Sequence, residues 1–240
     1  MARNKPITDA ELYKFHVENL RSIDRAIGQV ELLAKEAIRK DRLPMIDALL
    51  RTHLLLLGAW TECRLKKLLY EQNGFNAAER EAVRAKGTQL ERWATTIDIG
   101  FKRRYGVENF SINTLRHTAF NRYAALQSAL SNDIGPVIEL RNKLAHGQWY
   151  YLLTNDEDAI AQKAMAQINT SNLLSSKFKL QIVGFIANLV HDLVVSTAFE
   201  RDFDDHFEKF MNAHTNLKNR NYGDYVQQLK DRHRRGQLRR

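Results

Sequence analysis

The chain has 240 residues, of which 44% are hydrophobic and 27% charged, and this ordinary globular composition argues against a wholly disordered chain. The low numbers of Pro (3) and Gly (11) favour helices over turn-rich β architectures, and a single cysteine, Cys63, excludes an intramolecular disulfide or a Cys-rich zinc site. Lys and Arg number 37 against 28 Asp and Glu, so the net charge of +9 indicates a polyanionic partner.

Hydrophobic residues in the N-terminal half recur at helical spacing. Thr8 and Glu11 have the spacing of a capping box, which predicts a first helix that begins there and continues to about Lys40. Pro44 suits the first turn of a second, strongly apolar helix that ends near Tyr70. Three further helices are predicted over residues 77–86, 89–105 and 111–129, followed by a turn at residues 131–133.

A short helix then separates the two halves of the chain. Pro136 opens it, and Gly147, which is free to adopt a positive φ, ends it. The residues that follow are aromatic and extended in character, so a small β-hairpin insert is predicted over residues 146–163.

The rest of the chain is predicted to be helical again, over residues 172–212, where an interruption is allowed for, and over residues 222–233. The basic end, residues 230–240, is expected to fray. Because there is no repeat, linker or shift in composition, we predict one all-α domain over residues 1–240 with a hairpin insertion.

No segment has the character of a targeting signal or a membrane anchor. Residues 1–9 lack the apolar stretch of a secretory signal. The most apolar run, residues 182–199, contains Asn188, His191 and Asp192, so we expect a buried helix there rather than a membrane span. We therefore expect a cytoplasmic protein.

The end of the short helix carries residues suited to phosphate chemistry, in the order Arg-Asn-Lys-Leu-Ala-His-Gly over residues 141–147. At about 100° per residue, Asn142 and His146 lie one turn apart on the face opposite the core. Arg141 lies beside the core stripe, from which its long side chain can reach outward. The predicted core stripe consists of Val137, Leu140 and Leu144.

An imidazole next to a guanidinium is what metal-independent cleavage of RNA requires. A histidine can act as a general acid or base near neutral pH, and a guanidinium can bind two phosphate oxygens at once. When a ribose 2′-hydroxyl attacks its own phosphate, His146 would move protons and Arg141 would stabilise the charge that builds on phosphorus. The structural alternative is that His146 caps the helix and that the Arg-Asn pair is merely solvated.

The residues Arg141-Asn142-x-x-Ala145-His146-Gly147 at a helix end resemble the motif of the HEPN superfamily of all-helical domains, in which Arg and a polar residue precede His. The order of elements is similar as well, because long helices precede the motif helix, an extended insert follows it, and further helices close the chain. The resemblance implies a HEPN-like helical bundle. It also implies, as for many HEPN proteins, a metal-independent endoribonuclease of antiphage defence or toxin–antitoxin systems.

The resemblance assigns a role to each motif residue. Arg141 would stabilise the scissile phosphate, His146 would act as acid or base, and Asn142 would orient the site. HEPN ribonucleases pair two motifs across a dimer, so one motif per chain implies a homodimer that acts on RNA without metal or cofactor. The products would carry 2′,3′-cyclic phosphate and 5′-hydroxyl ends, and an antitoxin or regulatory protein is a further expected partner.

Two functions other than RNA cleavage stay open. The chain could be an inactive HEPN-like module that binds RNA, a nucleotide or a protein, or a helical scaffold without a nucleic-acid role.

The aromatic residues 149–151 could stack on RNA bases or pack a hairpin against the core. Basic residues 102–104 and 232–240 could form a phosphate track or be solvated ends. His191 with Asp192 is interpreted as a core polar pair, and Glu62 could pair with an arginine near the site.

Overall fold

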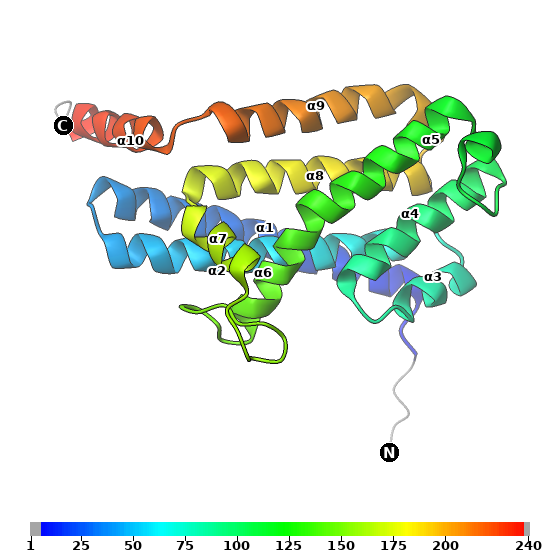
Figure 1. The fold of residues 1–240 in the computed structure, drawn as a ribbon, viewed down its shortest axis with the longest axis horizontal. Helices are drawn as coiled ribbons and strands as arrows, with labels where there is room; N and C mark the ends of the chain where they lie inside the picture. Colours follow the sequence, from blue (N-terminus) through cyan, green and yellow to red (C-terminus); the bar gives the residue numbers. More distant parts are fainter. Residues whose placement is uncertain (1–5, 238–240) are drawn as a thin grey trace, which may run out of the picture.

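The computed structural model describes residues 6–237 as a bundle of helices joined by short connections, apart from the longer loop between residues 145 and 162 (Figure 1). The all-α prediction is confirmed. In chain order the helices are α1 (Asp9–Arg39), α2 (Leu43–Leu69), α3 (Ala77–Arg84), α4 (Gln89–Tyr105), α5 (Ile112–Ala129), the π-helical turn η1 (Leu130–Ile134), α6 (Gly135–Ala145), α7 (Gln162–Thr170), α8 (Leu173–Val195), α9 (Phe199–Asn219) and α10 (Tyr222–Gln237).

Side chains of the first turn fix the beginning of several helices. Thr8 Oγ1 accepts a hydrogen bond from the backbone N–H of Glu11 at 3.3 Å, and the Glu11 carboxylate accepts one from the Thr8 N–H at 2.8 Å. This is the capping box that the sequence predicts. The same reciprocal pattern begins α3, α4 and α8, with Asn76, Thr88 and Asn172 as the capping residues.

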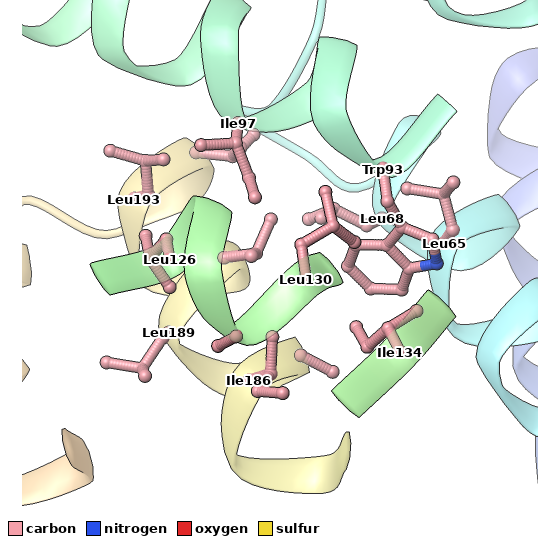
Figure 2. Packing of buried hydrophobic residues seen from close by; sticks show 14 of the residues in the cluster. Leu65, Leu68, Trp93, Ile97, Leu126, Leu130, Ile134, Ile186, Leu189 and Leu193 are labelled. Carbon is pink, nitrogen blue, oxygen red and sulfur yellow. The ribbon is translucent and has the colours of Figure 1, made fainter. Parts of the chain in front are cut away.

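The main core lies where α2, α4, α5, η1 and α8 meet, as Figure 2 shows. Trp93 and Ile97 of α4 are fully buried there against apolar side chains of η1 and α8. A second, smaller cluster joins α2, α6 and α7 and consists of Leu50, Leu54, Leu140, Leu144, Leu152, Ala164 and Ile168. This smaller cluster holds the short helix α6 and the loop that follows it.

The predicted turn at residues 131–133 is wrong. After the non-helical residue Arg116 near the beginning of α5, the chain continues through η1 into α6 as one helical rod that crosses the bundle diagonally (Figure 1). Leu130 and Ile134, four residues apart, are both buried in the main core. Their burial on one helical face outweighs the turn preference of the intervening Ser-Asn-Asp sequence.

The predicted β-hairpin over residues 146–163 is not formed. Among residues 6–237 there are no strands, and the segment contains one isolated antiparallel bridge, between Leu153 and Ile160. Two backbone hydrogen bonds of 2.8 Å, from Thr154 to Ala159 and from Ala161 to Leu152, close the loop. Because Leu152 is its only fully buried apolar residue, the segment has no continuous apolar face on which a hairpin could pack. Helix α7, which the sequence analysis did not predict, begins directly after it.

The C-terminal helices also differ from the prediction in detail. The interruption allowed for within residues 172–212 falls at residues 196–198, and the second helix continues to Asn219. The basic end does not fray from residue 230, because α10 extends to Gln237; residues 238–240 lie outside the described part of the chain. Burial of Leu229 and an ion pair of 2.5 Å between Lys230 and Asp41 fasten α10 to the end of α1.

Two helices, α2 and α8, are long and apolar enough to cross a membrane by length and composition alone. Core helices of proteins that never enter a membrane meet the same criteria. Both helices contribute side chains to the main core, so their apolar character is weak support for a membrane location.

Candidate functional site

Helix α6 presents two opposite faces, as the helical spacing predicts. It packs against α2, and the predicted core stripe is buried, with Val137, Leu140 and Leu144 each at most 4% exposed. Asn142 and His146 lie on the other face and are exposed. The fold therefore leaves this helix end accessible to a ligand or to a second copy of the chain.

The last turn of α6 is closed by a Schellman motif. Gly147 has φ +82°, and its N–H donates to the carbonyl of Leu144 at 3.2 Å. The N–H of Gln148 donates to the carbonyl of Lys143 at 3.1 Å. The indole N–H of Trp149 donates to the same Leu144 carbonyl at 2.9 Å, which fastens the loop to the helix end. His146 consequently occupies a fixed position at the terminus.

The imidazole of His146 is exposed and has no hydrogen-bond partner among the residues that the structure describes. Its backbone N–H donates to the Asn142 carbonyl at 3.1 Å, so the two residues are joined within one helical turn. The imidazole nitrogens are thus free to exchange protons with a bound molecule.

Arg141 lies between α6 and α2 and is oriented by two acceptors. One guanidinium nitrogen donates to Asn142 Oδ1 at 3.0 Å and another donates to Glu62 Oε2 at 2.9 Å. Glu62 also pairs with Lys66 at 2.7 Å. Burial alone would raise the pKa of Glu62, but the hydrogen bond and charge of Lys66 and the charge of Arg141 together hold that pKa below its usual range.

A glycine allows α6 to approach α2 closely at this point. A Cβ atom on Gly58 would lie 2.1 Å from Cβ and 2.5 Å from Cγ of Arg141. Carbon atoms cannot approach so closely, so any side chain at position 58 would push the two helices apart. Gly58 is therefore a positioning residue for Arg141 that the sequence analysis did not identify.

A groove of about 940 Å³ lies beside the exposed end of α6. Asn142, Lys143 and His146 line it together with Thr88 and Leu90 at the start of α4. The loop after α6 and Lys163 of α7 complete its walls. The groove brings Asn142 and His146 together, whereas the guanidinium of Arg141 reaches Asn142 from the α2 side.

The aromatic residues 149–151 do not pack a hairpin against the core, which was the alternative to stacking on RNA bases. Tyr150 is 72% exposed and Tyr151 is 57% exposed, and their rings contact each other edge to face at 4.7 Å. Trp149 is partly covered and is hydrogen-bonded to the end of α6. The segment is fastened further because Arg51 donates to the Trp149 carbonyl at 2.5 Å.

The other features considered in the sequence have structural roles. Arg103 and Arg104 donate to backbone carbonyls at the end of α8, so the guanidinium groups of two of the three basic residues at 102–104 have acceptors within the protein, although Arg103 is also exposed. His191 contacts Asp192 at 3.2 Å and Glu71 at 3.5 Å, in a polar network between helices.

Within residues 6–237 no group of three or more His, Cys, Asp or Glu side chains is arranged to hold a metal ion. No family model, no curated protein and no solved structure matches the chain. The comparison with HEPN domains therefore rests on residues 141–147 and on the order of the helices.

Proposed function

We propose that the protein is a metal-independent endoribonuclease, of HEPN type, whose active centre forms where two copies of the α6 end meet in a homodimer. The observation that supports it is the exposed imidazole of His146, which has no partner among residues 6–237 and lies one turn from Asn142, itself hydrogen-bonded to the guanidinium of Arg141. An imidazole and a guanidinium at one accessible helix end are the groups that such chemistry requires.

The reaction assigns a step to each group. One His146 imidazole takes the proton of a ribose 2′-hydroxyl, whose oxygen then attacks the adjacent phosphorus. Arg141 stabilises the charge on the phosphate oxygens, and the bond from phosphorus to the 5′ oxygen breaks. A protonated imidazole, supplied by the second copy of His146, gives its proton to the leaving oxygen. The products are a 2′,3′-cyclic phosphate and a 5′-hydroxyl end.

The test is cleavage of RNA by the purified protein in the presence of EDTA. We expect new 5′-hydroxyl ends with the wild type and none with His146→Ala or Arg141→Ala. His117→Ala is a matched control, because His117 is also an exposed helical histidine one turn from an asparagine, Asn121, but lies on α5. Activity should fall with the square of the protein concentration below the dissociation constant of the dimer. A folded dimer that cleaves neither structured nor unstructured RNA contradicts the proposal.

One observation favours a second candidate, an inactive module that binds RNA, a nucleotide or a protein partner. The carboxylate of Glu62 already neutralises much of the charge of Arg141 in the isolated chain. This candidate predicts salt-dependent RNA binding without new 5′-hydroxyl ends and with little change in His146→Ala.

An endoribonuclease of this type fits a cytoplasmic role as a toxin or an antiphage effector, controlled by an antitoxin or regulatory protein. Expression of the wild type should then arrest growth, and expression of His146→Ala should not. Equal growth of the two strains with equal protein levels counts against this role.

A further inference from the structure

Lys143 brings a largely buried positive charge to the groove beside His146. The residue is 8% exposed and lines the groove. Its ammonium donates to Asn155 Oδ1 at 3.1 Å, and no carboxylate of the described residues forms an ion pair with it. Glu139 and Glu157 line the same groove and are exposed.

Lys143 lacks the carboxylate partner that usually accompanies a lysine so little exposed to solvent. A buried charge is normally compensated by an opposite charge and by hydrogen bonds to its donors. Lys143 has three N–H donors, and one neutral amide oxygen satisfies one of them. The other two donors are available to an anion that enters the groove.

Three other partly buried lysines of the described chain do have carboxylate partners. Lys35 and Lys177 both pair with Glu31, and Lys67 pairs with Glu71. Lys179 of α8 resembles Lys143 in its partner, because it is hydrogen-bonded to a neutral oxygen, Ser171 Oγ, at 3.3 Å. It does not line the groove beside His146, and it therefore provides a matched control.

We propose that Lys143 binds a backbone phosphate of the RNA strand next to the phosphate that is cleaved. The inference rests on the proposed function and adds a substrate-binding residue to it. Asn155 holds the ammonium in place before the substrate arrives, so that little side-chain freedom is lost on binding. A phosphate oxygen supplies both the negative charge and the acceptors that the free chain lacks.

The decisive variant is Asn155→Asp, which keeps the lysine and gives it an internal carboxylate. If Lys143 binds phosphate, the new carboxylate competes with RNA, and the affinity should fall about tenfold while the fold becomes no less stable. If the lysine serves only to fasten the loop, Asn155→Asp should leave RNA binding unchanged. Lys143→Met removes the charge and should weaken binding and lower the slope of log affinity against log salt by about 0.7.

Binding is measured by fluorescence anisotropy of a labelled single-stranded RNA at several salt concentrations, with every variant made in the His146→Ala background so that no cleavage interferes. Lys179→Met should match the parent. In the Lys143→Met background, Asn155→Asp should have a much smaller effect than alone. An unchanged affinity in both Asn155→Asp and a folded Lys143→Met overturns the inference. Because binding needs no cleavage, this result is independent of whether the wild type proves to be a ribonuclease.

Discussion

The Arg141 guanidinium donates to the carboxylate of Glu62 at 2.9 Å, across the interface between α6 and α2. The side chains are 34% and 25% exposed, respectively, so the pair lies at the edge of solvent and is worth about 1 kcal/mol or less to the fold. Its larger effect is on orientation, because Glu62 and Asn142 together fix two of the guanidinium nitrogens.

Removal of Glu62 should therefore lower kcat without raising KM. In Glu62→Ala we expect kcat for RNA to fall about tenfold, because Arg141 loses its orientation in the transition state. KM should stay equal or fall, because a negative charge near the substrate is gone. Glu62→Gln keeps an acceptor for Arg141 and should retain most of the activity. Wild-type kcat in Glu62→Ala, measured by initial rates of cleavage, would show that the pair has no role in orientation.

The close contact between Gly58 and Arg141 predicts that adding one methyl group at position 58 strongly destabilises the protein. Gly58→Ala should destabilise the protein by about 1–3 kcal/mol, because α2 and α6 must separate to admit the Cβ, and it should abolish any activity that depends on Arg141. Gly28→Ala and Gly184→Ala are controls in other helices, where a Cβ meets nothing within 4 Å. These two should stabilise the fold by about 0.5–1 kcal/mol. Urea denaturation distinguishes them, and equal stabilities for all three variants would contradict the packing argument.

The spacing of residues along one helix was sufficient to predict some features of the fold and of the candidate site. The spacing of Val137, Leu140 and Leu144 predicts the buried face of α6, and the exposure of Asn142 and His146 follows from the same arithmetic. The capping box of Thr8 and Glu11 likewise depends on residues three positions apart, so the sequence was enough to predict it.

Features that depend on distant partners could not be found in this way. From the sequence, Glu62 could pair with an arginine near the site, and the structure confirms such a pair, but the residues are 79 positions apart and no local pattern identifies Arg141 as the partner. The role of Gly58 depends on the crossing of two helices, which the sequence does not specify. The predicted turn before α6 failed for a related reason, because burial of Leu130 and Ile134 outweighed the local preference of the residues between them.

The arginines at the end of α4 should matter for stability rather than for RNA binding. The Arg104 guanidinium donates to the carbonyls of Asp192 and Leu193 at 3.1 and 3.0 Å, and to that of Ser196, where it caps the end of α8. Arg104→Met should cost about 2–3 kcal/mol in the free energy of unfolding, because these carbonyls lose a charged donor. Its affinity for RNA should equal that of the wild type. A salt-dependent loss of RNA affinity would instead support the phosphate track at residues 102–104.

The two exposed tyrosines predict a preference for unpaired RNA. Tyr150 and Tyr151 lie on a fastened loop directly after the motif helix, where the proposed substrate would bind. Stacking on an aromatic ring contributes about 1–3 kcal/mol per base and requires a base that is not paired. Tyr150→Ala and Tyr151→Ala should each weaken binding of single-stranded RNA by about tenfold or more, and Tyr→Phe should not. If the same variants instead dissociate the dimer, the tyrosines belong to the interface between subunits.

The His191–Glu71 contact predicts how stability depends on pH. The hydrogen bond to Glu71 raises the pKa of His191. Burial would raise the pKa of Glu71, but hydrogen bonds from His191 and Lys67 lower it to about 2. The charged imidazole therefore stabilises the fold fully below its unfolded pKa of about 6.5, and this contribution is lost as the pH rises through the folded value. The Glu71 contribution is lost as the pH falls from about 4.5 towards 2.

His191→Gln should accordingly lower the free energy of unfolding most near pH 5.5, by about 1–2 kcal/mol, and least at a pH well above the folded pKa of His191, where the wild-type imidazole is neutral too. Urea denaturation at the two pH values measures the difference. His206 also contacts Asp192, at 3.3 Å, and stays intact in this variant, so that the change reports on position 191. His117→Gln, which removes an exposed histidine without a carboxylate partner, should show no pH-dependent loss. Equal losses for His191→Gln at both pH values would mean that packing, rather than charge, is what position 191 contributes.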